Sequence, residues 1–415
     1  MIHVHYPSAP SSVSMAPKIV TTEPPCVALV LAGGGARSAY QVGVLKALAQ
    51  LLPAARNPFS VIVGTSAGAV AASALAAHAH RWHDGVVALE DVWSAFHVHH
   101  VFRVDPAAML RAGAHWTLSA LSAGLLLPAP RSLFDNGPLR ELLARRIDWR
   151  AIRENVESGV LQAIALSATT YSGGRHTVFF DGAPELAEWR RASRIGRRSV
   201  LGIDHVMASV AIPLLFPSVR IGSCYYGDGA MRQLAPLSPA IHLGAERILV
   251  VGVRSLSGAG IGALIGRAQP PSTGQLFGFL LDTLFSDQLE GDLEQMRRLN
   301  TLVANTPELV PGVRPLEAML LAPSVEPSVI AARYLHTLPV ALRVLLSVIG
   351  ARGAAGSLLA SYLMFESAFT RDLIALGEAD TLAQRDELLA FFAGQPPSRV
   401  EPVAPVEPVA ISGAG

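Results

Sequence analysis

Apolar runs alternate with segments of helical periodicity over residues 26–253, and this alternation limits the fold more than any other feature of the sequence. The runs CVALVLA (26–32) and FSVIV (59–63) lack a regular polar alternation, which is typical of strands covered on both faces. Helical segments follow them at 41–52 and 67–80. Further strands are predicted at 161–169, 176–180, 219–227 and 246–253. This order predicts an α/β fold with a mainly parallel central sheet flanked by helices.

The domain organisation follows from changes in composition along the 415-residue chain. Both ends are rich in Pro, Ser and Val and have no periodicity, which indicates disorder. After Val253 a Gly/Pro-rich loop leads into a region that reads as helical throughout. The less regular stretch 92–134 is expected to form a cap or lid. We expect four segments: a disordered N-terminal segment (1–25), an α/β domain (26–255), a helical C-terminal extension (256–394) and a disordered Pro-rich tail (395–415).

Composition excludes some classes of function and location. The chain is 51% hydrophobic and 16% charged, which favours a large buried core, and its net charge of +1 argues against a nucleic-acid partner. Two cysteines, Cys26 and Cys224, provide no disulfide framework, so we expect a reducing compartment and a cytoplasmic location. No basic segment followed by an apolar one marks a signal peptide near the N-terminus.

The longest apolar region, residues 338–365, is interrupted by Arg343 and Arg352. A membrane span needs about 20 apolar residues without central charges. We interpret this region as core helix. The alternative is a membrane-facing surface, peripheral at the inner membrane.

A serine stands at the corner between the second predicted strand and the helix after it. In GTSAG (64–68) the serine, Ser66, has Gly64 and Gly68 two places away on either side. Glycines at these positions remove the Cβ atoms that would collide at a tight strand-to-helix turn, as in the G-x-S-x-G nucleophile elbow. The N-terminus of the following helix favours developing negative charge. The pattern predicts a nucleophile, with a glycine-rich turn and an N-cap serine as the alternative.

Three glycines, Gly33, Gly34 and Gly35, follow the first strand, and Ala36 continues the turn. Their backbone N–H groups could hold a phosphate or an oxyanion. Neither phosphate-binding spacing is present. The pattern G-x-x-x-x-G-K-[ST] is missing, and G-x-G-x-x-G fails because Ser38 stands where it needs its last glycine. Parallel neighbouring strands would bring this loop close to the serine corner, which favours an oxyanion hole. Three roles are open for Arg37: it steadies the loop, it contacts the phosphate of a lipid substrate, or it lies on the surface.

The residues do not by themselves decide which group accepts the serine proton. Thirteen histidines are present, but the groups at 78–83 and 97–100 lack the i, i+4 spacing of a helical metal pair, so no metal and no cofactor is expected. His205, His242 and His336 stay open as bases.

Three aspartates lie next to or near glycine after apolar residues: Asp135, Asp181 and Asp228. A plain turn is the usual role of such a pair. Asp228 ranks first because Gly227 and Gly229 allow the backbone on both sides to approach closely.

Four blocks in order resemble the patatin-like phospholipase family. These are GGGARSAYQVGVL (33–45), GTSAG (64–68), ASVAIPLLFPSV (208–219) and GDGAMRQLAPLSPAIHLGAERILVV (227–251). The resemblance spans about residues 27–253, and two C-terminal blocks, 281–300 and 361–380, are similar to a bacterial subset of the family.

The resemblance implies a patatin-like α/β sandwich with a Ser-Asp dyad and no catalytic histidine. Ser66 would be the nucleophile, Asp228 the base, and the loop at 33–36 the oxyanion hole. Ala32 and Ser38 depart from the fuller family pattern, at positions where some members carry aspartate and glycine.

The implied activity is hydrolysis of carboxylic esters in a lipid or phospholipid, phospholipase A- or lysophospholipase-like, through an acyl-enzyme. Three alternatives stay open: a Ser-His-Asp esterase of the α/β-hydrolase type with His242 or His336 as base, a non-catalytic protein that binds a lipid headgroup or nucleotide, and a transacylase. The sequence does not indicate an oligomeric state.

Overall fold

A single ten-stranded sheet forms the centre of the computed structural model, which describes residues 25–53, 57–122, 125, 131–256, 270–305, 315–351 and 353–395. The strand order along its main path is β10-β9-β1-β2-β3-β4-β6-β5, and β8, paired with β7, branches from β3. The strands are β1 (Val27–Leu31), β2 (Val61–Thr65), β3 (Ala163–Thr170), β4 (Arg175–Gly182), β5 (Trp189–Arg190), β6 (Arg194–Arg198), β7 (Val219–Ile221), β8 (Cys224–Asp228), β9 (Arg247–Val251) and β10 (Glu317–Leu321). Strands β10, β9, β1, β2 and β3 are parallel to one another, which confirms the predicted mainly parallel α/β sheet.

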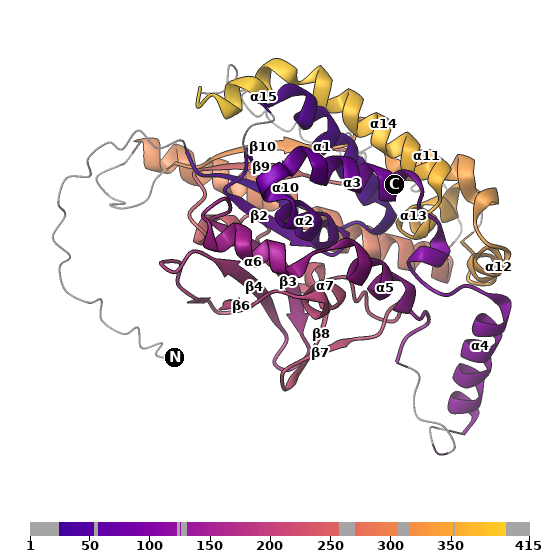
Figure 1. Ribbon diagram of the computed structural model, residues 1–415. Coiled ribbons are helices and arrows are strands. Elements are labelled where there is room, and N and C mark those ends of the chain that lie inside the picture. Colours follow the sequence, from indigo (N-terminus) through magenta and orange to yellow (C-terminus); the bar gives the residue numbers. More distant parts are fainter. Residues whose placement is uncertain are drawn as a thin grey trace, which may run out of the picture.

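Helices cover both faces of this sheet (Figure 1). They are α1 (Ala39–Leu51), α2 (Ala67–Ala77), α3 (Trp82–Ser94), α4 (Pro106–Leu121), α5 (Gly137–Arg146), α6 (Trp149–Glu157), α7 (Ile203–Ser209), α8 (Ser238–His242), α10 (Thr273–Asn305), α11 (Pro327–Tyr334), α12 (Val340–Val348), α13 (Gly353–Leu363), α14 (Ser367–Ala383) and α15 (Arg385–Phe392). Short 3-10 turns include η1 (Gly35–Ser38), η3 (Val98–His100) and η4 (Gly229–Arg232).

The central strands have the double-sided burial that their sequences predict. Every residue of β1 and β2 is buried. Along β1 the side chains alternate between two apolar cores, with Leu29 and Leu31 in one and Ala28 and Val30 in the other. Because apolar cores cover both faces of these strands, a functional site is expected at the ends of the strands.

The C-terminal extension does not read as helical throughout, which corrects the sequence prediction. Residues Glu317–Leu321 form β10, which pairs in parallel with β9 and enlarges the central sheet. A run of five residues between long helices has too few positions to separate a strand from a helix by periodicity. In the described residues the extension is thus helical apart from β10, which adds an edge strand to the sheet.

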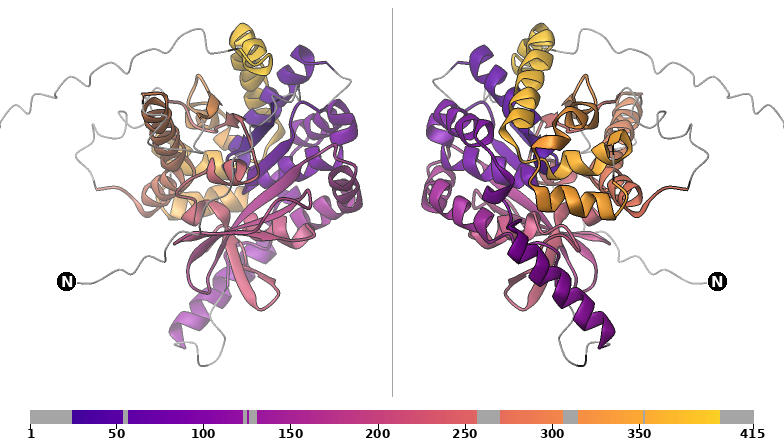
Figure 2. Two further views of the ribbon diagram at one scale, coloured as in Figure 1. Left: turned by 90° about the vertical axis from the view of Figure 1, so that its left-hand side faces the viewer. Right: turned by 90° about the vertical axis from the view of Figure 1, so that its right-hand side faces the viewer.

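Helix α14 of the extension packs along α1, and Figure 2 shows the yellow C-terminal helices against the indigo N-terminal ones. Two glycines permit this close contact. A Cβ atom at Gly43 would collide with the carbonyl oxygen of Ile374, and one at Gly377 with the carbonyl oxygen of Tyr40. These two helices bind the last segment of the chain to the first βα unit.

Three further predictions can be compared with the structure. The predicted strand 219–227 is a hairpin of β7 and β8 that turns at Gly222, whose φ is +61°. Within 92–134, α4 extends away from the body (Figure 1). The ends predicted to be disordered, apart from residues 25 and 395, lie outside the described residues.

The long apolar region 338–365 forms two helices, α12 and α13, separated by Gly350. No helix in the described parts of the chain is long and apolar enough to cross a membrane. Helix α13 is largely buried, whereas α12 buries Leu342 and Leu346 and exposes Val340, Val344 and Val348. The core-helix interpretation is therefore right for α13 and only for one side of α12.

Candidate active site

Ser66 occupies a tight corner between β2 and α2. Its φ of 54° and ψ of −126° are unusual for a residue with a side chain, and a strained conformation of this kind persists only where its surroundings hold it. The two flanking glycines are required by space. A Cβ atom at Gly64 would lie 2.5 Å from the carbonyl oxygen of Gly68, and one at Gly68 would collide with the carbonyl oxygen of Leu31. The local geometry is that of a nucleophile elbow.

The Ser66 hydroxyl donates a hydrogen bond to Asp228, with 2.6 Å between Oγ and Oδ2, although the two residues are 162 positions apart in the chain. Strand β3 brings them together because β2 and β8 pair with successive parts of one edge of β3, β2 as far as Ser167 and β8 from Ala168, which lies opposite Asp228, while β4 pairs with the other edge. Gly229 is needed at this junction, since a Cβ there would collide with the carbonyl oxygen of Ser167.

Asp228 is fully buried, and its surroundings control its ionisation. Its Oδ1 accepts a hydrogen bond of 2.9 Å from the Ala230 amide, and its own amide donates to the carbonyl oxygen of Ala211 at 2.9 Å. Burial raises the pKa of the Asp228 carboxyl to about 7, against the smaller lowering effect of the hydrogen bonds from Ser66 and Ala230. A carboxylate with this pKa can both accept and return a proton near neutral pH.

The Ser66 backbone is held by a residue that the sequence analysis did not identify. Its amide donates to the hydroxyl of Ser209, with 2.9 Å between nitrogen and Oγ. Ser209 ends α7 and is fully buried. It lies within the block 208–219 quoted above, but a single serine among apolar residues gave no signal of its own.

The glycine loop lies directly beside the serine corner because β1 and β2 are parallel neighbours, with Leu31 opposite Gly64. A Cβ atom at Gly33 would be 3.0 Å from the Ser66 Cβ. Within the part of the chain that the structure describes, the amides of Gly33 and Gly34 donate no hydrogen bond. Free amides so close to a hydroxyl are what an oxyanion hole requires.

Arg37 does not lie on the surface, which corrects one of the three sequence expectations for it. Its side chain is completely buried, with Nη1 3.3 Å from Asp282 and 3.0 Å from Glu326. Nε donates to the Ser361 hydroxyl at 2.7 Å, and the guanidinium lies 4.0 Å from the centre of the Tyr362 ring. Arg37 thus joins the glycine loop to α10, to the start of α11 and to α13 of the extension. These contacts agree with the expectation that Arg37 steadies the loop.

The remaining candidate bases lie elsewhere. In the described chain no histidine hydrogen-bonds to Ser66. His242 instead contacts the carbonyl oxygen of Ser238 at 2.8 Å and stacks on Trp189, and His336 lies in the turn between α11 and α12. Asp135 caps a turn and pairs with Arg103 at 3.0 Å.

Asp181, the third aspartate considered, lies near the end of β4, opposite Ile164 of β3. Among the described residues, no cluster of three or more His, Cys, Asp or Glu side chains has the geometry of a metal site.

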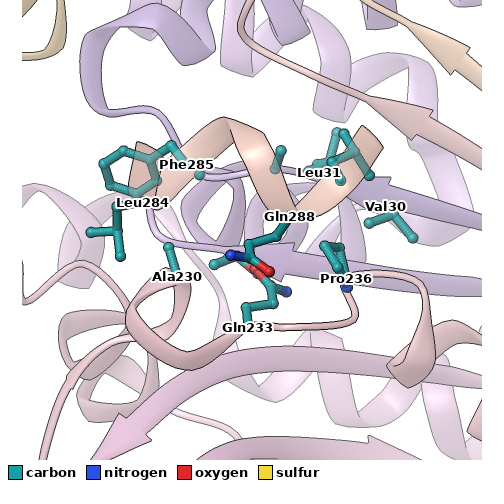
Figure 3. A pocket seen from close by; sticks show the side chains of 12 residues that line it. Val30, Leu31, Ala230, Gln233, Pro236, Leu284, Phe285 and Gln288 are labelled. Atoms are coloured by element: carbon teal, nitrogen blue, oxygen red, sulfur yellow. The ribbon is translucent and has the colours of Figure 1, made fainter. Parts of the chain in front are cut away.

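Helix α10 closes the site from above (Figure 3). Phe285 reaches the glycine loop, so that a Cβ at Gly33 would be 2.7 Å from its ring. The cavity that remains is about 20 Å³, room for about one water. It is lined by Val30, Leu31, Ala32, Gly33, Thr65, Ala230, Gln233, Pro236, Leu284, Phe285, Gln288 and Leu289. An acyl chain does not fit this space.

Gln233 places a polar group in the same cavity, and the sequence analysis missed it. Its Nε2 donates to the Thr65 hydroxyl at 2.8 Å and lies 3.4 Å from the Ser167 hydroxyl. Thr65 precedes Ser66, so Gln233 fixes the end of β2. Thr65 lies within GTSAG and Gln233 within the block 227–251, but neither side chain carried a signal of its own there.

The family model of patatin-like phospholipases matches residues 29–241, just over half of the chain, and covers both Ser66 and Asp228. The chain belongs to the patatin-like phospholipase family. No curated protein sequence matches this patatin-like chain significantly.

Several solved structures are similar to this patatin-like chain. Human GIVD cytosolic phospholipase A2 in complex with methyl gamma-linolenyl fluorophosphonate has a TM-score of 0.41 and 13% identity, over 89% of this chain and 58% of that one. VipD from Legionella pneumophila has a TM-score of 0.29 and 13% identity, over 85% and 67%. The type III effector protein ExoU has a TM-score of 0.27 and 17% identity, over 55% and 43%. The chain thus spans 58% of the length of the human enzyme.

Proposed function

We propose that the chain is a serine acyl hydrolase that cleaves carboxylic ester bonds in lipids, with Ser66 as nucleophile and Asp228 as proton acceptor. The observation that carries the proposal is the 2.6 Å hydrogen bond from the Ser66 hydroxyl to a fully buried carboxylate. Membership of the patatin-like phospholipase family supports a lipid ester as the substrate class.

In the first step Ser66 Oγ bonds to the carbonyl carbon of the ester, and its proton passes to Asp228 Oδ2. The carbonyl oxygen becomes an oxyanion, which the amides of the loop Gly33, Gly34, Gly35 and Ala36 would stabilise. The tetrahedral intermediate then expels the alcohol, which takes the proton from Asp228. An acyl-enzyme on Ser66 and a free alcohol are left, and the carboxylate is ionised again.

In the second step water attacks the acyl-enzyme while Asp228 accepts a proton from that water. The oxyanion forms again at the glycine loop, and collapse returns the proton to Ser66 Oγ and releases the carboxylic acid. One carboxylate serves both half-reactions, because a pKa of about 7 lets it hold and release a proton at neutral pH.

The substrate class is proposed to be a phospholipid or lysophospholipid, cleaved by a phospholipase A- or lysophospholipase-like reaction. Apolar side chains of α10, Leu284, Phe285 and Leu289, line the cavity next to the glycine loop, which supports an apolar acyl chain over a charged group. We further propose that the protein acts in the cytoplasm. It would associate peripherally with membranes, because its phospholipid substrate resides in them.

The experiment compares hydrolysis of a soluble short-chain ester and of a defined phospholipid by the purified wild-type chain, Ser66→Ala and Asp228→Asn. We expect both variants to lose at least about 1,000-fold in kcat. His242→Gln is the matched control, because it replaces the base of the Ser-His-Asp alternative, and it should keep wild-type activity. Substantial turnover by purified, folded Ser66→Ala protein would contradict the proposal.

A further inference from the structure

The first two turns of α10 expose three large apolar side chains. Leu276 is 49% exposed, Phe279 54% and Leu280 62%. Their i, i+3 and i+4 spacing places them on one side of the helix. Soluble monomers rarely expose contiguous apolar side chains of this size without a use for them.

Two glycines on the opposite side of α10 fix this orientation. A Cβ atom at Gly274 would lie 2.6 Å from the Cβ of Ala351, and one at Gly278 would lie 3.0 Å from the amide nitrogen of Leu359. The helix is therefore packed tightly against Ala351 and the middle of α13, and its apolar row cannot turn inwards without breaking that contact.

Helix α12 continues the apolar surface. Val340, Val344 and Val348 are 65%, 56% and 77% exposed and follow one another every fourth residue along one side. The amide of Gly274 donates to the carbonyl oxygen of Ile349 at 2.7 Å, so the start of α10 adjoins the end of α12. We call the six residues Leu276, Phe279, Leu280, Val340, Val344 and Val348 the α10–α12 face.

Charge distinguishes this face from a surface helix such as α6. Segments 273–281 and 340–348 contain no acidic residue, and their one charged residue is the exposed Arg343. Helix α4, on the same side of the molecule as α12 (Figure 2, right), also has no acidic residue and carries the exposed Arg111. By contrast, α6 carries paired charges of both signs, such as Arg150 with Glu154 at 2.7 Å.

The helix that carries half of the α10–α12 face also reaches the candidate active site with its opposite, buried side. Phe285, on the same helix as Leu280, lies against the glycine loop at Gly33, beside Ser66. A lipid that enters from this side would meet α10 first and the serine next.

We propose that the α10–α12 face docks on an anionic lipid bilayer. The proposal rests on the proposed function and names the surface through which the enzyme meets its substrate. The apolar side chains would enter the boundary between headgroups and acyl chains, as those of interfacial helices do. Arg343 and Arg111 would lie among anionic headgroups, and the lack of carboxylates removes the repulsion that such a surface would otherwise cause.

The test is co-sedimentation of the full chain, carrying Ser66→Ala so that vesicles stay intact, with vesicles of phosphatidylcholine alone or mixed with phosphatidylglycerol. We expect binding to the mixed vesicles and weak binding to phosphatidylcholine alone. Adding Phe279→Gln with Leu280→Gln should lower the partition coefficient at least about tenfold. The matched control is Leu382→Gln, which should bind like the parent. Leu382 is an exposed leucine (39%) at the end of α14, next in the chain to α15, and Figure 1 shows α15 far from α12.

Three results would overturn the proposal. They are no binding of the parent to mixed vesicles, equal binding to both vesicles, and unchanged binding of the folded double variant. A parent that is dimeric in sedimentation velocity and becomes monomeric in the double variant would assign the face to self-association instead. Because binding is measured without catalysis, failure of the docking proposal and failure of the proposed function, which soluble-ester hydrolysis tests, are separate results.

Discussion

The pH dependence of ester hydrolysis is expected to report the ionisation of Asp228. Burial raises the pKa of this carboxyl from 3.8 to about 7. Only the ionised form can accept the proton of Ser66, to which Asp228 is joined at 2.6 Å. The value of kcat/KM must therefore fall as the pH falls through the pKa of the free enzyme, with a slope of one proton.

The size of the effect follows from the pKa. With a pKa of about 7, the ionised fraction of Asp228 is about one half at pH 7 and about 1% at pH 5. We expect kcat/KM for a soluble ester to be roughly 100-fold lower at pH 5 than on the plateau near pH 9. A solvent-exposed aspartate with a pKa of about 3.9 would stay more than about 90% ionised at pH 5, and the rate would hardly change.

The assay quantifies the released acid by chromatography, because a chromogenic alcohol would itself titrate in this range. Circular dichroism at each pH shows that the chain stays folded, and return to pH 8 should restore the full rate. A kcat/KM that is flat from pH 5 to 9 in the folded protein would refute the argument that burial of Asp228 sets the activity.

Three variants test other parts of the account. Asp228→Asn should be inactive yet more stable than wild type at pH 9, by roughly 4 kcal/mol in urea unfolding, and equal to it near pH 4. The reason is that the pKa of Asp228 is higher in the folded than in the unfolded chain, so the wild-type protein loses stability as the pH rises from about 4 to 7. Equal stability of the two proteins at both pH values would contradict this. Phe285→Ala should raise kcat/KM for soluble esters several-fold while destabilising the fold by about 3–5 kcal/mol, and unchanged kinetics would show that the ring does not block Ser66. Arg37→Met should lower the free energy of unfolding by about 3–5 kcal/mol, since it removes the cation that Asp282 and Glu326 share and leaves Asp282 only Arg254, at 3.6 Å; a raised KM at full stability would support the substrate-contact role.

The strand-to-helix corner at Ser66 could be predicted from the sequence because its constraints are local. Gly64 and Gly68 are needed within a few residues of Ser66, so they appear as a short pattern. Asp228 has the same kind of local mark, a glycine on each side, and the resemblance to the family ranked it above the histidines. The central strands were predicted because burial on both faces requires continuous apolar runs.

Other parts of the site depend on contacts between distant segments and leave no local pattern. Ser209 meets the Ser66 amide across 143 positions, and Arg37 meets Asp282 across 245. The same holds for Phe285, which is one apolar residue among many in a long helix until the fold places it over Gly33. Strand β10 was missed because its five residues carry no clear period.

The central claim is that Ser66 becomes acylated and that Asp228 accepts its proton. Rapid-quench mass spectrometry of the intact protein and its peptides, after mixing with a soluble ester, tests both parts at once. We predict an acyl adduct on the peptide containing Ser66 in the wild-type chain, and no adduct on the same time scale in Asp228→Asn. An adduct on another residue, or acylation of Asp228→Asn at the wild-type rate, would contradict the account.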